Sequence, residues 1–161
     1  MADESSRRLT AAGRTMRPFE QSLPMALLRA REAVMRGFRR VLREHGLNEQ
    51  EWRIIRALKE VDRIDIGELA ERVFILKPSA TRTVKNLQRR NLVNRDKSAS
   101  DQRRAYISLT PEARELFDRL APKNEAEYSR ITEAIGGGDM KRLYELLRLV
   151  TERLNGNGRG C

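Results

Sequence analysis

The segment from Phe74 to Thr110 constrains the fold most, because its two halves have different periodicities. In the first half, Ala80, Val84 and Leu87 recur at intervals of four and three. Such residues lie on one side of an α-helix, in which successive side chains turn by about 100°. The second half alternates as the strands of a β-hairpin do, over residues 92–97 and 103–109. The segment is therefore predicted to be a helix followed directly by a hairpin.

A second short helix precedes this one in the sequence. It is predicted to start near Asp65 or Gly67 and to end before a turn at residues 74–77, and Pro78 then suits the first turn of the next helix. Two short helices joined by a tight turn form a helix-turn-helix, whose second helix can enter the major groove of DNA. With the hairpin added, the pattern predicts a winged helix.

The outer face of the second helix is polar and basic. Nine basic residues and only two acidic ones lie between Lys77 and Arg104, in a chain of net charge +10. Basic side chains near phosphate release condensed counterions on binding, so double-stranded DNA is the predicted partner. The alternative is an ordinary solvated helix face. The residues predicted to contact DNA from this helix are Lys77, Ser79, Thr81, Arg82, Lys85, Asn86 and Arg89.

Apolar residues at helical spacing also flank this region on both sides. They predict one helix that ends at Gly46, another that opens with Asn48 and Glu51 as a capping box, one that starts after Thr110, and a last one capped by Asp139. A winged helix does not need three of these helices, the first and the last two, for its own core. We therefore expect them to form a homodimer interface.

The predicted fold class is mainly α, a winged helix-turn-helix with N- and C-terminal dimerisation helices. Disordered tails are expected at residues 1–20 and 155–161, around one domain at 21–154. Within that domain, residues 47–110 form the predicted DNA-binding lobe, and residues 22–46 and 111–154 form the dimerisation helices.

Composition argues against several other classes. The chain has one histidine, and its one cysteine, Cys161, is the last residue, so neither an intrachain disulfide nor a cysteine metal cluster is expected. It has no glycine-rich phosphate loop, so we predict no enzyme and no cofactor. No apolar run is long enough to cross a bilayer, which predicts a cytoplasmic protein without membrane association.

The sequence DQRRAYISLT, residues 101–110, resembles the D-x-R-x₅-L-T wing signature of the MarR family of bacterial transcription regulators. The order of predicted elements agrees with that family from about residue 22 to 154. The stretch SLPMALLRAREAVMRGFRRVLREHGLNEQEWRIIRAL resembles the branch that controls homoprotocatechuate and related aromatic-acid degradation operons. A peroxide-sensing relative is disfavoured, because no cysteine lies near the first helix.

The resemblance implies a dimeric repressor on a pseudo-palindromic operator, released by a small effector, here a phenolic or aromatic carboxylate or its thioester. By position, Arg103 is the wing arginine that reaches the minor groove, Asp101 orients it, and Arg104 shares the task. A purely structural salt bridge between Asp101 and Arg103 is the alternative. For the function, the alternative is an architectural basic DNA-binding protein without ligand response.

Three residues are candidates for the effector site, and each has a second interpretation. Arg29 suits a carboxylate partner but also a structural salt bridge. His45 and Trp52 lie near the expected junction of the dimer helices and the DNA-binding lobe. His45 equally suits a cation at a helix C-terminus, and Trp52 equally suits the core.

Overall fold

The computed structural model describes residues 16–97 and 105–156, and the chain divides into two compact units, residues 1–36 and 37–161. The first unit contains the short 3₁₀ turn η1 (Phe19–Gln21) and the beginning of α2 (Leu23–Glu44). The prediction of a disordered tail over residues 1–20 is therefore wrong at its last two residues, since Phe19 and Glu20 belong to η1. Ser22 follows this turn, and its hydroxyl donates to the Phe19 carbonyl at 3.0 Å.

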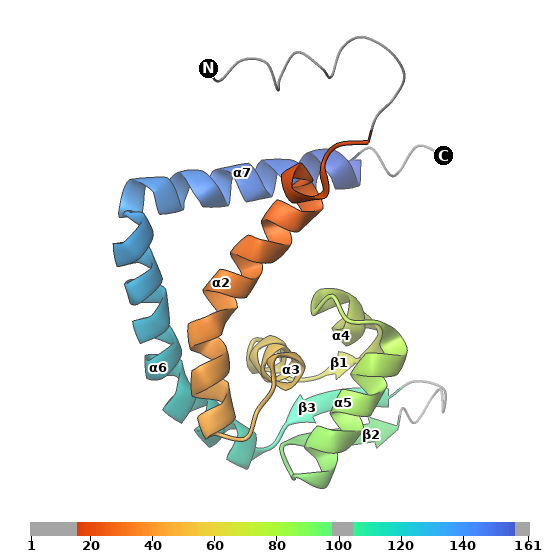
Figure 1. The fold of residues 1–161 in the computed structure, drawn as a ribbon. Coiled ribbons are helices and arrows are strands. Elements are labelled where there is room, and N and C mark those ends of the chain that lie inside the picture. The colour runs from red at the N-terminus through yellow and green to blue at the C-terminus, as the bar shows by residue number, and fades with distance from the viewer. Residues whose placement is uncertain (1–15, 98–104, 157–161) are drawn as a thin grey trace, which may run out of the picture. The chain divides into compact units, whose positions relative to one another are not determined.

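The second unit contains the remaining elements (Figure 1). After the end of α2, they are α3 (Glu49–Lys59), β1 (Ile64–Asp65), α4 (Ile66–Arg72), α5 (Lys77–Arg89), β2 (Val93–Lys97), β3 (Ala105–Leu109), α6 (Pro111–Ile135) and α7 (Gly137–Gly156). Helix α4, the following turn and α5 form the predicted helix-turn-helix, and β2 with β3 forms the predicted hairpin.

The three strands form one antiparallel sheet in the order β1-β3-β2. Val93 lies opposite Leu109, and Arg95 lies opposite Ile107, which pairs with Ile64 of β1 on its other side. The two-residue strand β1 was expected to be part of a connection. Its pairing with β3 is a long-range contact, and a segment of two residues is too short to show the alternation that predicts a strand.

One core holds α3, α4, α5, the sheet and α6 together. Leu58, Leu69, Val84, Ile107 and Leu120 are fully buried in it and come from five different elements. Burial of side chains of this size stabilises the fold by roughly 1.5–3 kcal/mol each. The expectation that the helix after Thr110 is not needed for this core is therefore wrong, because Ala113, Leu116 and Leu120 of α6 belong to it.

Three helices start with a side chain that caps their first turn. Asn48 accepts from the Glu51 N–H while the Glu51 carboxylate accepts from the Asn48 N–H, which confirms the capping box. Asp65 accepts from the Gly67 N–H, and Thr110 accepts from the Ala113 N–H. These bonds satisfy backbone donors that a helix leaves free at its first turn.

The C-terminal helices differ from the prediction at two points. Gly136 has φ +92° and ends α6, but α7 starts at Gly137, so Asp139 lies within its first turn and is not its cap. Helix α7 also continues to Gly156, so Asn155 and Gly156 do not belong to a disordered tail. Within the described residues, no helix is long and apolar enough to cross a membrane.

Candidate nucleic-acid interface

Helix α5 has one buried face and one exposed basic face. Ala80, Val84 and Leu87 are fully buried, as the periodicity predicted, and Thr83 is 9% exposed beside them. The basic residues of the opposite face are exposed: Lys77, Arg82, Lys85 and Arg89. Because the apolar triplet is locked in the core, the helix cannot rotate, and these charges face outward.

The N-terminal turn of α5 carries small hydroxylated residues. The Thr81 hydroxyl donates to the Lys77 carbonyl at 2.9 Å, and the Thr83 hydroxyl donates to the Ser79 carbonyl at 2.9 Å. Ser79 and Thr81 are half-buried. The oxygen of Thr81 keeps lone pairs that can accept a hydrogen bond from a nucleic acid.

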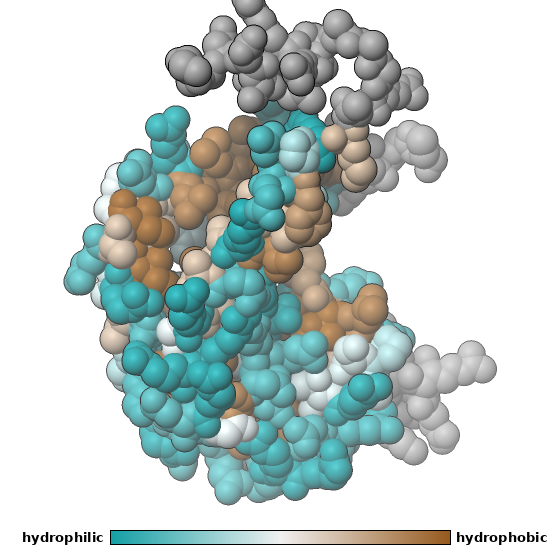
Figure 2. Space-filling model, in the orientation of Figure 1, coloured by the Kyte–Doolittle hydropathy of each residue, from teal (hydrophilic) through white to brown (hydrophobic). Residues whose placement is uncertain are grey.

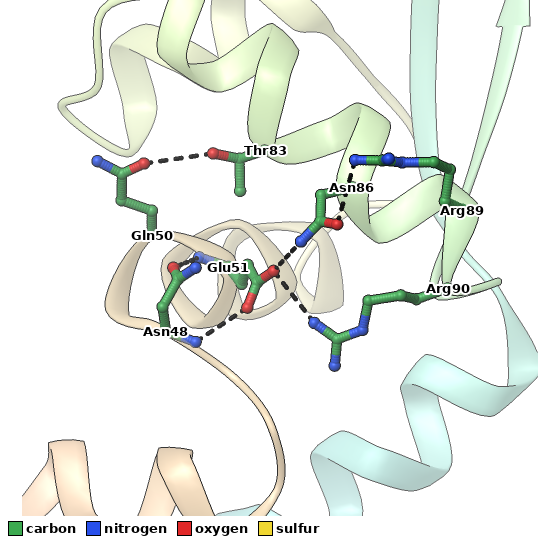
Figure 3. A network of polar contacts seen from close by, with 7 residues as sticks. All are labelled: Asn48, Gln50, Glu51, Thr83, Asn86, Arg89 and Arg90. Carbon is green, nitrogen blue, oxygen red and sulfur yellow. Dashed lines mark hydrogen bonds and ion pairs between the residues drawn. The ribbon is translucent and has the colours of Figure 1, made fainter.

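Glu51 of α3 connects its own capping box to α5 (Figure 3). Its side chain is 3% exposed, and its Oε1 accepts from the Asn86 amide at 2.6 Å and from the Arg90 guanidinium at 3.1 Å. Its Oε2 accepts from the Asn48 N–H at 2.9 Å. A buried carboxylate needs such partners, because an unpaired one would be strongly destabilising. Three donors from two segments thus converge on one side chain.

Asn86 lies differently from the sequence expectation, which placed it beside the basic face. It is half-buried, its amide nitrogen donates to Glu51, and its amide oxygen accepts from Arg89 at 3.5 Å. Asn86 therefore holds α5 against α3 and has little capacity left for a base edge. Its DNA contact is a prediction that this geometry disfavours.

Sequence reasoning missed the role of Arg90 and used Glu51 only as half of a capping box. The sequence does indicate that Glu51 is near the core, because the capping box is followed by the apolar residues Trp52 and Ile55. These residues place Glu51 at the edge of a buried helix face. What was absent is the identity of the partners, because Asn86 and Arg90 are 35 and 39 residues away. No local pattern joins residues at that separation.

The wing agrees with the predicted strands over residues 93–97 and 105–109, and its tip lies outside the described residues. The hairpin runs from Val93 to Lys97 and returns from Ala105 to Leu109. The predicted minor-groove residues Asp101, Arg103 and Arg104 lie between the two strands, beyond the part of the chain that the structure describes. Their roles stay predictions.

The three effector candidates lie in different environments. Arg29, in the first unit, forms an ion pair with Glu20 and also donates to its backbone carbonyl at 3.2 Å. Trp52, in the second unit, is 6% exposed and stacks on Phe117 with ring centroids 5.4 Å apart. Trp52 thus has the core environment that was its alternative interpretation.

His45 follows the last turn of α2. Its Nδ1 lies 3.0 Å from the Val41 carbonyl, and its Nε2 lies 3.3 Å from the Lys123 ammonium. These two contacts place the ring between the end of α2 and α6. Both interpretations of His45 stay predictions.

No set of His, Cys, Asp and Glu side chains suited to a metal ion is found in residues 16–97 and 105–156. The site that the described residues do form is a rigidly held helix with a basic outer face, preceded by a tight turn and followed by an antiparallel hairpin. This arrangement defines the class of winged helix-turn-helix DNA-binding proteins.

Comparison with known proteins agrees with this class. A profile of the MarR family matches residues 45–104. The homoprotocatechuate degradative operon repressor of Escherichia coli is 43% identical over 126 residues, which cover 78% of this chain and 85% of that protein. The chain belongs to the MarR family of transcription regulators.

Solved structures agree as well. The transcriptional regulator PA4135 has a TM-score of 0.77 and 40% identity, with 81% of this chain and 96% of that chain covered. NadR in complex with 4-hydroxyphenylacetate has a TM-score of 0.69 and 34% identity, with 85% of this chain and 97% of that chain covered. The winged helix-turn-helix fold predicted from the sequence is thereby confirmed.

Proposed function

We propose that the protein is a dimeric, sequence-specific repressor that binds a pseudo-palindromic operator with α5 in the major groove. The observation that carries the proposal is the fixed orientation of α5, whose buried triplet and Glu51 anchor leave Arg82, Lys85 and Arg89 facing outward. Arginine can form two parallel hydrogen bonds to the edge of a guanine, whereas lysine more often contacts phosphate as a point charge. We assign base recognition to Arg82 with Ser79 and Thr81, and phosphate contacts to Lys77, Lys85 and Arg89.

The exposed apolar side chains of α7 support a homodimer. Leu143, Leu147 and Val150 are between 36% and 39% exposed, and Tyr144 and Leu154 are at least 60% exposed. Brown, apolar surface is visible at the upper left of Figure 2, where α7 begins in Figure 1. A continuous apolar stripe of this kind is unfavourable in water and is typical of a surface that a second copy covers. Two copies would present two α5 helices to successive major grooves, about 34–36 Å apart.

The relatives support an aromatic acid as effector. One is named as the repressor of a homoprotocatechuate degradative operon, and NadR was solved with 4-hydroxyphenylacetate. We propose a phenolic or aromatic carboxylate, or its thioester, for this chain. Arg29 is the candidate for the carboxylate, with His45 and Trp52 as further candidates, and Arg29 would have to exchange Glu20 for the ligand.

Genome-wide footprinting tests the operator, and the genes beside the footprint would identify the pathway. We expect protection of one or a few palindromic sites. Protection of DNA without sequence preference would instead support the architectural alternative, which the net charge of +10 alone would explain.

Titration of the operator complex with phenolic acids and their coenzyme thioesters tests the effector. We expect release by at least one of them, with phenols that lack the carboxylate as matched controls. If none of the compounds releases DNA, the effector class is wrong while the DNA-binding proposal stands. A reporter gene behind the footprinted promoter distinguishes repression from activation.

A further inference from the structure

The turn between α4 and α5 exposes two large apolar side chains. Phe74 is 88% exposed and Leu76 is 79% exposed, whereas Ile75 between them packs against the core. An open hollow of about 660 Å³ lies beside them, lined by this turn, by Lys77 and by Gly67, Ala70 and Glu71. Single exposed apolar residues are common on proteins, but two on one tight turn form a patch.

Phe74 occupies a backbone conformation that its residue type disfavours. Its φ is +51°, its N–H donates to the Glu71 carbonyl at 3.1 Å, and the Ile75 N–H donates to the Ala70 carbonyl at 3.0 Å. This pair of bonds is a Schellman motif, in which the left-handed position is usually glycine or asparagine. A left-handed conformation is costly for a residue with a bulky side chain.

Two other helices of this chain end in the same motif and follow the usual preference. Helix α2 ends with Gly46 at φ +65°, and α5 ends with Asn91 at φ +54°. In each, the two backbone bonds of the motif are present, with the Leu47 and Leu92 N–H groups as the second donors. Among these three described helix ends, the phenylalanine after α4 is therefore the exception.

Leu76 is a second exception at the other end of the turn. It stands at the N-cap of α5, because its carbonyl accepts from the Ala80 N–H at 2.9 Å, but no side-chain bond caps the helix. Helices α3, α4 and α6 start with Asn48, Asp65 and Thr110, whose side chains accept from the first turn. Leucine is among the least favourable residues at this position.

The two apolar residues directly precede the basic face of α5. Lys77 is the next residue and is exposed, and Arg82 and Lys85 follow on the same helix. In helix-turn-helix proteins, the N-terminal residues of the recognition helix contact base edges. The apolar group that the major groove offers is the C5-methyl group of thymine, which accepts contact from side chains such as phenylalanine.

We propose that Phe74 and Leu76 contact thymine methyl groups in the major groove and thereby specify A·T pairs at one edge of each half-site. The inference rests on the proposed function, because it requires α5 to enter that groove. It gives a role to the large apolar side chains at two positions where the local backbone favours glycine and a polar cap. These are specificity-determining residues that the basic-residue pattern does not reveal.

The first experiment separates stability from binding. Phe74→Gly relieves the left-handed strain and Leu76→Ser supplies a cap, so each variant should raise Tm by roughly 2–4 °C. Each should also weaken binding to the duplex that the protein itself selects from a random-sequence pool, by about fourfold per lost methyl contact. Phe74→Leu is the matched control, since it keeps an apolar side chain and should bind within about twofold of the wild type.

The second experiment replaces each thymine of the selected duplex with uracil, which lacks only the methyl group. Wild-type protein should lose about fourfold in affinity at one or two positions of each half-site. The Phe74→Gly or Leu76→Ser variant should lose nothing further at the position that it has ceased to contact. The inference would be overturned if, at every position, the uracil substitution weakened binding of the variant by the same factor as binding of the wild type. It would also be overturned if no uracil substitution weakened binding of the wild type.

These outcomes are distinct from failure of the proposed function. A protein that selects no sequence from the pool refutes both the function and this inference. A protein that selects a palindrome, but whose Phe74→Gly and Leu76→Ser variants bind it as the wild type does, refutes only the inference.

Discussion

At the scale of single residues, the outer face of α5 divides the work of DNA recognition between residue types. Arg82 and Lys85 are both exposed and lie three residues apart, so they lie on neighbouring parts of one face. Their chemistry differs, because a guanidinium can form two parallel hydrogen bonds to a guanine edge and an ammonium cannot. Removing one positive charge at position 82 should therefore affect DNA binding differently from removing one at position 85.

Arg82→Ala is expected to cost about 1–3 kcal/mol of discrimination between the operator and other sequences. Lys85→Ala should weaken binding to all sequences and reduce the slope of log K against log salt by about 1. Fluorescence anisotropy with operator and scrambled duplexes at several salt concentrations measures both quantities. Arg119→Ala, an exposed position of α6, controls for loss of charge alone. Equal losses on both duplexes for Arg82→Ala and Lys85→Ala would contradict the division.

At the scale of elements, two buried glutamates hold helices together. Glu51 joins α3 to α5, and Glu127 of α6 accepts from Arg40 of α2 and from Arg130, each at 2.9 Å. Gly37 of α2 permits this approach, since a Cβ atom there would lie 2.0 Å from a Glu127 carboxylate oxygen. Both glutamates fix helices whose positions matter for a DNA-reading surface.

Glu51→Gln is expected to lower the free energy of unfolding by about 1–3 kcal/mol, because one accepting carboxylate oxygen becomes an NH₂ donor that faces other donors. Operator affinity should fall with it, since Asn86 and Arg90 lose part of their anchor. Urea denaturation and operator titration measure the two effects. Glu60→Gln, at an exposed ion pair with Arg72, is the matched control and should change stability by less than about 1 kcal/mol. A fully stable Glu51→Gln variant would show that the network does not hold α5.

Glu127 predicts a specific pH dependence of stability. The hydrogen bond and charge of Arg130, together with Arg40, hold the pKa of Glu127 below its ordinary value, although burial opposes this shift. A lowered pKa in the folded state adds stability above the ordinary pKa of glutamate, near 4.3, and this is lost as pH falls through the folded pKa. Wild-type protein should therefore lose more stability than Glu127→Gln between neutral pH and pH values below about 4. Parallel curves of unfolding free energy against pH for the two proteins would refute this.

At the scale of the whole molecule, the apolar surface of α7 requires a partner for the chain to function as we propose. Leu147 is 39% exposed, and its neighbour Arg148 pairs with Glu152 at 3.0 Å on the same helix. In a dimer, a carboxylate at position 147 would be buried without a partner, which costs several kcal/mol. At position 148 the loss of an exposed ion pair has little cost.

Leu147→Glu is accordingly expected to raise the dimer dissociation constant by at least about 100-fold, whereas Arg148→Ala should leave it nearly unchanged. Sedimentation equilibrium measures this dissociation constant. Operator titration should show that the Leu147→Glu variant binds each half-site weakly and without cooperativity. A Leu147→Glu variant that stays dimeric would place the interface elsewhere.

Sequence by itself determined the long helices, the helix-turn-helix, the hairpin and the buried face of α5, but neither η1 nor β1. Helical spacing, the caps at Asn48 and Thr110, and the alternation of the hairpin are local features, because they depend on backbone hydrogen bonds over a few residues. The buried triplet of α5 follows from the same periodicity, so the exposed basic face was predictable. The family resemblance added the expected roles of Asp101, Arg103 and Arg104, which remain predictions.

Only the tertiary structure decided which side chains meet across the chain. The pairing of β1 with β3, the burial of Glu51 against Asn86 and Arg90, and the fit of Gly37 to Glu127 join residues 35 or more positions apart. The exposure of Phe74 and Leu76 also became visible only there, since an apolar residue in a sequence is expected to be buried. Burial and long-range polar contacts depend on how the elements pack, and local periodicity carries no information about packing partners.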